Sequence, residues 1–435
     1  MCHTAVLWVE ESYPAAAAIQ LLDGKSLYRD IWFDKPPLSA YFYLLWGART
    51  GVLLRIAGSI FVLLCCLILY RLARETWSAR EGLISALLLA FFLTFGIPSA
   101  VIALAPDLLM ILPHAAAVYL AWRGRAFWAG LTAGIALLIN SKGVFVLAAC
   151  TLWAWQAWPW LLLGFALPNA AAFVWFGRPY FEEVWKWGAL YSEHTFAWQT
   201  GLTRTLDWAG FQSALVIGAA YFLWRERDRR MLAWLVISLI AVAAGWRFFP
   251  RYYFQLLPPM ALMAARGYTL LKNKRAAILV LLLIPLVRFG PRYLNLANDL
   301  AHNRQSDWTD LRLDQDSQDA STIIGSSGTL LVWGYRPDIF VYTRLPAGSR
   351  FLDSQPLTGV IADRRLTSSE VDAPELAAQN RRELMQAKPT WIADGLGPLN
   401  PALAITNYPD LHDWLKNYRE FSRTKYTVIY RRLTE

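Results

Sequence analysis

The chain has 435 residues, of which 56% are hydrophobic and 17% are charged. Because soluble domains carry roughly 25% charged residues, this composition excludes an ordinary soluble protein and indicates membrane segments. The net charge of +10 does not indicate nucleic-acid binding, since the basic residues form short clusters between apolar runs, as cytoplasmic anchors do. We therefore expect membrane lipids, and no nucleic acid, among the partners.

Residues 1–50 are predicted to form an extracytoplasmic first loop with juxtamembrane helices. No apolar run long enough to cross a bilayer precedes Glu10, and the opening MCHTAVLW lacks the basic region of a signal peptide. Glu10 must nevertheless be delivered to the outer face. We therefore expect the natural protein to start upstream of Met1 and to carry one further span.

Residues 51–290 are predicted to form a transmembrane helical domain of about ten spans, because apolar runs recur there between charged flanks. The predicted spans cover residues 52–70, 81–95, 107–122, 126–140, 143–157, 159–176, 208–224, 231–246, 251–265 and 276–287. Several of them contain nearer 15 residues than the ~20 that usually cross a bilayer, so their ends are approximate.

The basic clusters set the expected orientation of these spans. The tightest clusters lie at residues 71–80, 123–125, 225–230 and 272–275, and even numbers of predicted spans separate them. All four can therefore lie in the cytoplasm, as the positive-inside rule requires. The first loop and everything after residue 290 then face the opposite side.

Residues 291–435 have the polar composition of a soluble domain, and we expect a small extracytoplasmic α/β domain there. Alternating apolar patterns predict strands within 329–343, 389–395 and 424–433, and a helical pattern covers 373–387. The four cysteines of the whole chain show neither disulfide nor metal-binding spacing.

The first loop ends in an unusual motif, YRDIWFDKPPL at residues 28–38, directly before the apolar chain. A carboxylate there can accept a proton from an attacking hydroxyl, while Lys or Arg can neutralise a departing phosphate. Pro36 and Pro37 restrict the backbone of Lys35 and the angle at which the loop meets the membrane. The alternative is a solvated loop with no function of this kind.

The segment EESYPAAAAIQLLDGKSLYRDIWFDKPPL resembles the first outer loop of bacterial GT-C class integral-membrane glycosyltransferases, relatives of the protein O-mannosyltransferases and of the lipid A aminoarabinose transferase. That loop carries an acidic pair, a helix of small residues, G-x-x-x-Y-R-D and an acidic or His residue before K-P-P. The resemblance continues through Asp107, the element ALLINSKG at 136–143, the span at 250–265 and the segment VWGYRPDIFVYT at 332–343. It therefore covers nearly the whole chain in the same order.

The resemblance implies roles for individual residues. It gives the catalytic base as Glu10 or Glu11, where relatives commonly have Asp first, and points Asp107 into the same cavity. It implies that Lys35 contacts a lipid phosphate, and that Asp34 binds the acceptor or a metal. The implied substrate-binding residues are Arg29, Asp34, Lys35, Lys142, Arg251 and Tyr253.

Other interpretations of these residues stay open. Asp107 follows Pro106 and could cap a helix, and Arg251 could anchor a span at the membrane interface. Relatives often have a His near Arg251, and this chain has none there, so a divalent metal is optional rather than required. The acidic and His residues in the loop at 177–207 favour an amphipathic surface helix over a lining of the acceptor path; they are Glu182, Glu183, Glu193 and His194.

The sequence thus predicts a multi-pass α-helical, GT-C-like membrane protein of a bacterial inner membrane. We expect it to transfer a sugar from a polyprenyl-phosphate donor to a glycan, lipid or protein acceptor on the extracytoplasmic face, by a single displacement with inversion. One alternative is a lipid or lipid-linked-sugar flippase, which would tend to show paired internal halves. The other is a non-catalytic relative that only binds the lipid-linked sugar.

Overall fold

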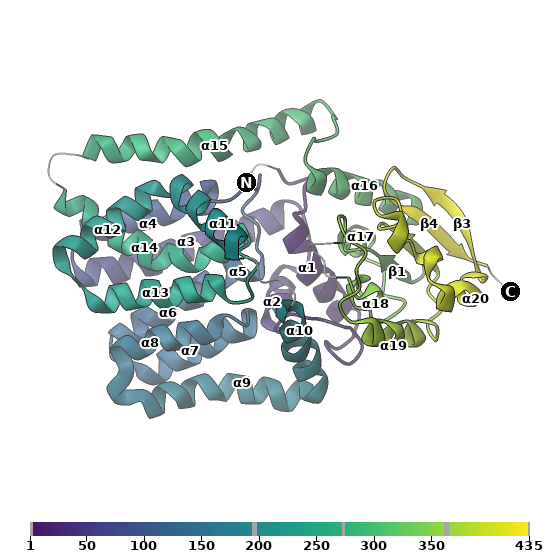
Figure 1. Cartoon of the computed structure of the whole chain (residues 1–435), viewed down its shortest axis with the longest axis horizontal. Helices are drawn as coiled ribbons and strands as arrows, with labels where there is room; N and C mark the ends of the chain where they lie inside the picture. Colours follow the sequence, from purple (N-terminus) through teal and green to yellow (C-terminus); the bar gives the residue numbers. More distant parts are fainter. Residues whose placement is uncertain (1–2, 194–197, 272–274, 361–364, 434–435) are drawn as a thin grey trace.

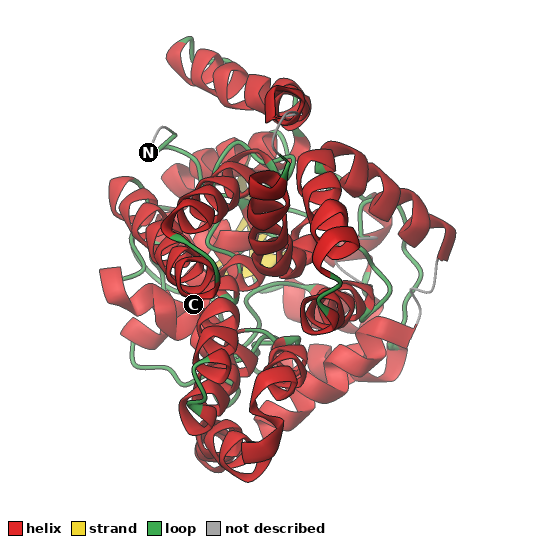
Figure 2. Ribbon diagram, turned by 90° about the vertical axis from the view of Figure 1, so that its left-hand side faces the viewer, coloured by secondary structure: helices red, strands yellow, loops and turns green. Residues whose placement is uncertain are grey.

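The structure, a computed structural model, describes residues 3–193, 198–271, 275–360 and 365–433. A helical bundle forms one end of the molecule, and a small domain with the only described strands forms the other (Figure 1). Viewed from the bundle end, the strands lie behind the helices (Figure 2). Between the two parts lie α1 (Val9–Leu22), α2 (Leu38–Tyr41) and the 3-10 helix η1 (Phe42–Trp46).

The bundle follows the predicted spans closely. Its elements are α3 (Val52–Thr76), α4 (Ala79–Phe95), α5 (Pro106–Leu109), α6 (Ile111–Trp122), α7 (Ala126–Ile139), α8 (Gly143–Ala154), η2 (Trp155–Ala157), α9 (Trp158–Tyr180), the π-helix η3 (Phe181–Lys186), α10 (Trp187–Glu193), α11 (Trp198–Phe211), α12 (Ser213–Glu226), α13 (Arg229–Ala243), η4 (Pro250–Leu256), α14 (Leu257–Leu270) and α15 (Arg275–Ala301). Each predicted span overlaps helical residues, although the predicted spans 126–140 and 231–246 run past the ends of α7 and α13, and α15 runs on without a break past residue 290.

Three described helical runs are long and apolar enough to cross a membrane: Val52–Thr76, Gly143–Leu190 and Val280–Ala301. A fourth is formed if α11 and α12 are one broken span, because they meet at a bend of 88°. The prediction of one continuous span over 208–224 is therefore wrong at this bend, where the buried Gln212 amide donates to the Gly96 carbonyl at 2.9 Å. The chain is an integral membrane protein with multiple apolar helices.

Small residues let the helices of the bundle approach closely. A Cβ atom on Gly130 of α7 would lie 1.9 Å from the Leu161 carbonyl oxygen of α9, and one on Gly267 of α14 would lie 2.1 Å from the Gly218 carbonyl oxygen of α12. Neither position can hold a larger residue without separating the backbones. Such contacts are typical of helices that pack in a membrane, where close van der Waals contact replaces the hydrophobic effect.

The C-terminal domain contains a four-stranded mixed sheet in the order β1-β2-β4-β3. Its elements are α16 (Thr309–Ile324), β1 (Leu330–Trp333), α17 (Asp338–Thr343), α18 (Gln355–Thr358), α19 (Pro374–Leu384), β2 (Trp391–Asp394), η5 (Pro401–Leu403), η6 (Ile405–Asn407), η7 (Pro409–Leu411), α20 (His412–Leu415), β3 (Tyr418–Arg423) and β4 (Val428–Arg432). β1 and β2 are parallel, with Leu330 opposite Trp391, and β4 runs antiparallel to both of its neighbours.

Two details of this domain differ from the prediction. The apolar run at 338–343 was expected to form a strand, but it forms α17, because Pro337 begins a helix there and Asp338 lies in its first turn. Burial of this helix against α1 and α16 overrides the β-propensity of its residues. β3 was missed because its sequence, YREFSR, is charged and mostly exposed.

Strands β1 and β2 of the sheet are buried on both faces. Leu330 and Val332 of β1 belong to the large hydrophobic core that continues into the bundle, whereas Leu331 and Trp333 point into a second core that we call the tail core. The tail core also contains Trp32 from the first loop. The C-terminal domain is therefore packed directly onto the segment that carries the predicted site.

Candidate active site

A cavity of about 310 Å³ lies where the bundle, the first loop and the C-terminal domain meet. Its walls come from α1, the segment before α2, the start of α5, the turn between α7 and α8, η3 with α10, and the turn before η4. The charged residues that line it are Glu10, Asp34, Lys35, Asp107, Lys142, Arg247 and Arg251. Six of these seven were predicted from the sequence, although they lie up to 241 positions apart.

Arg251 joins the two carboxylates of the cavity. Its Nη1 contacts Glu10, and its Nε lies 3.3 Å from Asp107 Oδ2. Asp107 is only 7% exposed and accepts a further hydrogen bond from the Asn140 amide at 3.1 Å. It lies in the first turn of α5, whose N-cap is Ala105, so Asp107 is not itself the cap. The guanidinium thus lies between the carboxylates and also stacks over the Phe249 ring at 4.8 Å.

Lys35 and Asp34 form the second charged group of the cavity. Lys35 Nζ lies 3.0 Å from Asp34 Oδ2, and the two side chains are 39% and 10% exposed. The backbone here is held by the Tyr28 hydroxyl, which donates to the Lys35 carbonyl at 2.8 Å. Pro36 and Pro37 follow at once, and Pro37 is the N-cap of α2. The motif therefore places an ammonium group at the cavity edge with little backbone freedom.

Lys142 is the third cation. It is the N-cap residue of α8, and its Nζ lies 3.0 Å from the centre of the Tyr252 ring. This Nζ is buried and makes no hydrogen bond within the described part of the chain. Burial lowers the pKa of Lys142 to about 7, although Asp107 acts in the opposite direction. An anion arriving in the cavity would favour the charged form of this side chain.

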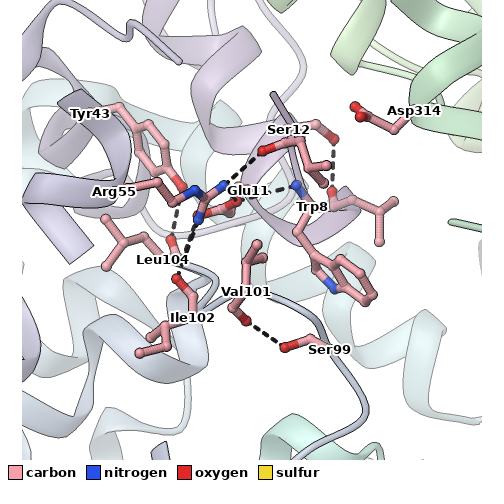
Figure 3. A network of polar contacts seen from close by, with 12 residues as sticks. Trp8, Glu11, Ser12, Tyr43, Arg55, Ser99, Val101, Ile102, Leu104 and Asp314 are labelled. Atoms are coloured by element: carbon pink, nitrogen blue, oxygen red, sulfur yellow. Dashed lines mark hydrogen bonds and ion pairs between the residues drawn. The ribbon is translucent and has the colours of Figure 1, made fainter. Parts of the chain in front are cut away.

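Glu11 does not line the cavity. Its carboxylate is fully buried and forms a two-armed ion pair with Arg55 of α3, at 2.7 and 3.1 Å. It also accepts the backbone N–H groups of Leu104 at 3.0 Å and of Trp8 at 3.2 Å. Figure 3 shows these groups converging on the one carboxylate. Of the acidic pair, only Glu10 faces the cavity, because neighbouring helical residues point about 100° apart.

Arg29 and Tyr253 also lie away from the cavity. Arg29 is 74% exposed and pairs with Asp30 at 2.9 Å on the surface. Tyr253 is buried, with its hydroxyl 2.7 Å from Thr205 Oγ1 and its ring stacked on Trp208. Its neighbour Tyr252 lines the cavity instead.

Several cavity residues were not predicted from the sequence. Tyr13 lies three residues after Glu10 on α1, so helical spacing could have signalled it. Nothing local marks Arg247, Trp187 or Tyr335, which come from the turn before η4, from the start of α10 and from the C-terminal domain. Asn140 is recognisable only through its hydrogen bond to Asp107.

The acidic residues expected on a surface helix separate into two kinds. Glu182 is 43% exposed and pairs with Arg178, as a surface residue would. Glu183 is only 3% exposed and contacts Arg350, so the expectation is wrong for this residue. Glu193 lies at the end of α10, and His194 lies outside the described residues.

The residues of the cavity do not form a metal site. Within the described ranges of the chain, no group of three or more His, Cys, Asp and Glu residues could hold a metal ion. Glu10 and Asp107 both face Arg251, whose single positive charge offsets one of the two negative charges.

The fold of the chain is similar to that of solved GT-C class integral-membrane glycosyltransferases. The chain is similar to the crystal structure of ArnT from Cupriavidus metallidurans bound to undecaprenyl phosphate, with a TM-score of 0.58, 14% identity, and coverage of 97% of this chain and 93% of that one. The apo state of the same protein matches with a TM-score of 0.54, 14% identity, and coverage of 98% and 93%.

A third solved structure, the apo form of the Archaeoglobus fulgidus oligosaccharyltransferase, matches with a TM-score of 0.50, 13% identity, and coverage of 97% of this chain and 70% of that one. In sequence, residues 34–176 match the family described as dolichyl-phosphate-mannose-protein mannosyltransferase. No curated protein matches the chain. The resemblance drawn from the loop motifs is thereby confirmed in sequence over residues 34–176 and, over nearly the whole chain, at the level of the fold.

Proposed function

We propose that the protein transfers a sugar from a polyprenyl-phosphate donor to an acceptor hydroxyl or amine. The observation that carries this proposal is the cavity in which Glu10 and Asp107 share Arg251, with Lys35 and Lys142 also in its walls. Carboxylates and cations in one small cavity meet the two needs of the reaction, which are to remove a proton from the acceptor and to stabilise a departing phosphate.

The cations receive the leaving group. As the bond between the anomeric carbon and the phosphate oxygen breaks, negative charge develops on the phosphate, and the Lys35 ammonium at the cavity edge is placed to bind it. Lys142 and Arg251 also line the cavity, and the negative phosphate would raise the charged fraction of Lys142. The prenyl tail would stay in the lipid beside the apolar helices.

Glu10 serves as the base. The acceptor oxygen attacks the anomeric carbon from the face opposite the phosphate, which gives inversion, and its proton passes to the carboxylate. Burial raises the pKa of Glu10 above its usual value of 4.5, whereas Arg251 lowers it. A carboxylate with a raised pKa is a stronger base when it is ionised. Asp107, held by Asn140, orients Arg251 and adds negative charge beside the acceptor.

The solved relatives support the choice of donor, since the ArnT structure holds undecaprenyl phosphate. The proposal also keeps the orientation expected from the basic clusters, with residues 1–50 and 291–435 on the outer face of a bacterial inner membrane and the helices of 51–290 between them. A reporter that is active only in the cytoplasm should stay silent when fused to the C-terminal end. A strong signal would put the cavity on the wrong side for this reaction.

The decisive experiment compares membranes from cells with and without the gene, and then the purified protein. Mass spectrometry of surface glycans should reveal one sugar that is lost with the gene. The purified full chain in nanodiscs should consume the matching undecaprenyl-phosphate sugar, and Glu10→Gln should slow turnover by roughly 10²-fold or more. Binding of the lipid without any turnover, for every donor in a panel, would instead identify a non-catalytic binding protein.

A further inference from the structure

The segment 32–34, which leads into Lys35, is held by groups from three separate parts of the chain. The backbone N–H of its first residue donates to the Arg350 carbonyl at 2.8 Å, the second N–H donates to Glu183 Oε2 at 2.9 Å, and the third donates to the Tyr13 hydroxyl at 3.4 Å. These partners come from the C-terminal domain, from η3 and from α1. The position of Lys35 therefore depends on tertiary contacts rather than on local structure.

Glu183 and Arg350 are paired with each other as well. Arg350 Nη2 contacts Glu183 Oε1 and also donates to the Tyr28 carbonyl at 2.7 Å. Tyr28 has a left-handed backbone with φ of 67°, a conformation that needs support from its surroundings. Its hydroxyl donates to the Lys35 carbonyl at 2.8 Å, so the pair holds both ends of the turn that presents Lys35.

The surrounding packing gives this pair little room to move. Glu183 is 3% exposed and Arg350 is 22% exposed. Trp32 and Trp187 meet edge to face with ring centres 5.8 Å apart, and both belong to the tail core. Trp187 also lines the cavity. One continuous packed unit therefore runs from the C-terminal domain to the cavity wall.

A break in α9 brings Glu183 inward. Gly177 adopts φ of 67° and ψ of −153°, a combination that residues with a Cβ avoid, and η3 follows it. Glu182 in the same π-helix points to solvent and pairs with Arg178. The two adjacent glutamates thus provide a functional candidate and a matched control within one turn.

We infer that Glu183 and Arg350 are positioning residues that tie the C-terminal domain to Lys35, so that this domain is a working part of the transferase site. Neither side chain lines the cavity, so neither touches the substrate directly. Their effect passes through the turn at 28–35, and a displacement of about 1 Å in a catalytic group can lower a rate by roughly 10²-fold. The inference rests on the proposed function.

The test measures turnover of the undecaprenyl-phosphate sugar and affinity for undecaprenyl phosphate, using the purified full chain well below its Tm. We expect Glu183→Ala to lower kcat/KM by roughly 10- to 100-fold, and to weaken binding of undecaprenyl phosphate. Glu182→Ala should change either quantity less than about twofold, because it removes an exposed ion pair. If Glu183→Ala does not fold, Arg350→Lys serves instead, since an ammonium group cannot replace the forked contacts of Arg350.

A double variant that combines Glu183→Ala with Lys35→Ala tests whether the Glu183–Arg350 pair acts through Lys35. If Glu183 works through Lys35, adding Glu183→Ala to Lys35→Ala should lower turnover by less than about threefold more, because residues that act together are not additive. A full multiplicative loss in the double variant, or a single variant that behaves like Glu182→Ala, would overturn the inference. A Lys35→Ala variant with normal turnover would instead overturn the proposed function, so the two failures are distinct.

Discussion

The acidic pair at the start of α1 offers the sharpest test of the site, because Glu10 lines the cavity whereas Glu11 is buried in an ion pair with Arg55. Glu11→Gln removes the negative partner of Arg55 in a setting where both side chains are 6% exposed or less. Breaking a buried ion pair by changing one partner destabilises a protein by about 3–5 kcal/mol. The neutral amide can keep part of the contacts, so we expect the lower end, about 3 kcal/mol.

Glu10→Gln should behave in the reverse way. Glu10 is 26% exposed, and its partner Arg251 has Asp107 as a second carboxylate at 3.3 Å. Loss of such a partly exposed pair changes stability by about 1 kcal/mol or less. Turnover should fall by roughly 10²- to 10⁴-fold, which is the usual contribution of a general base.

Both variants can be measured on the purified protein by thermal unfolding and by turnover of the lipid-linked sugar. Glu11→Gln should lower the Tm by roughly 3 °C, while the fraction that remains folded keeps nearly full turnover. Glu10→Gln should leave the Tm almost unchanged and lose turnover. The assignment would be refuted if Glu11→Gln kept its Tm and lost as much turnover as Glu10→Gln.

The remaining predictions concern the cations. Lys35→Ala should lower turnover by roughly 30-fold, because loss of a contact to a buried charge weakens binding by about 2–5 kcal/mol and the 39% exposure of Lys35 favours the lower end of this range. As a control, Lys388→Ala removes an exposed charge and should change turnover less than about threefold. Equal effects of the two variants would show that residues 28–38 form only a solvated loop. Arg251→Met should move the acidic limb of the pH–rate profile to higher pH, because Arg251 lowers the pKa of Glu10 and the base acts only when deprotonated. An acidic limb at the same pH, or at a lower pH, would contradict this prediction. Lys142 should take up a proton near pH 7 when undecaprenyl phosphate binds, because burial lowers the pKa of Lys142 to about 7 and the negative phosphate raises it again. Calorimetry in buffers of different ionisation enthalpy should detect this proton uptake in the native protein and not in Lys142→Met.

The sequence by itself determined the helices and the chemistry of the motif. Apolar runs, their charged flanks and the small residues between them are local properties, and each predicted span overlaps a helix of the structure. The charged motif beside the membrane was equally visible, since Asp34 and Lys35 precede two prolines and an apolar run. Six of the predicted residues meet in one cavity, and their residue types and neighbouring apolar runs were enough to point to them.

Only the tertiary structure decided which of these charges face the cavity. Glu10 and Glu11 are chemically equivalent in the sequence, and the choice between them follows from Arg55, which reaches α1 from a different helix. Lys25 looks like another loop charge, yet its Nζ contacts the Ala347 carbonyl. Glu183 is buried by contacts 150 positions or more away in the chain. Burial and partners are set by such distant contacts, and no local pattern of residues records them.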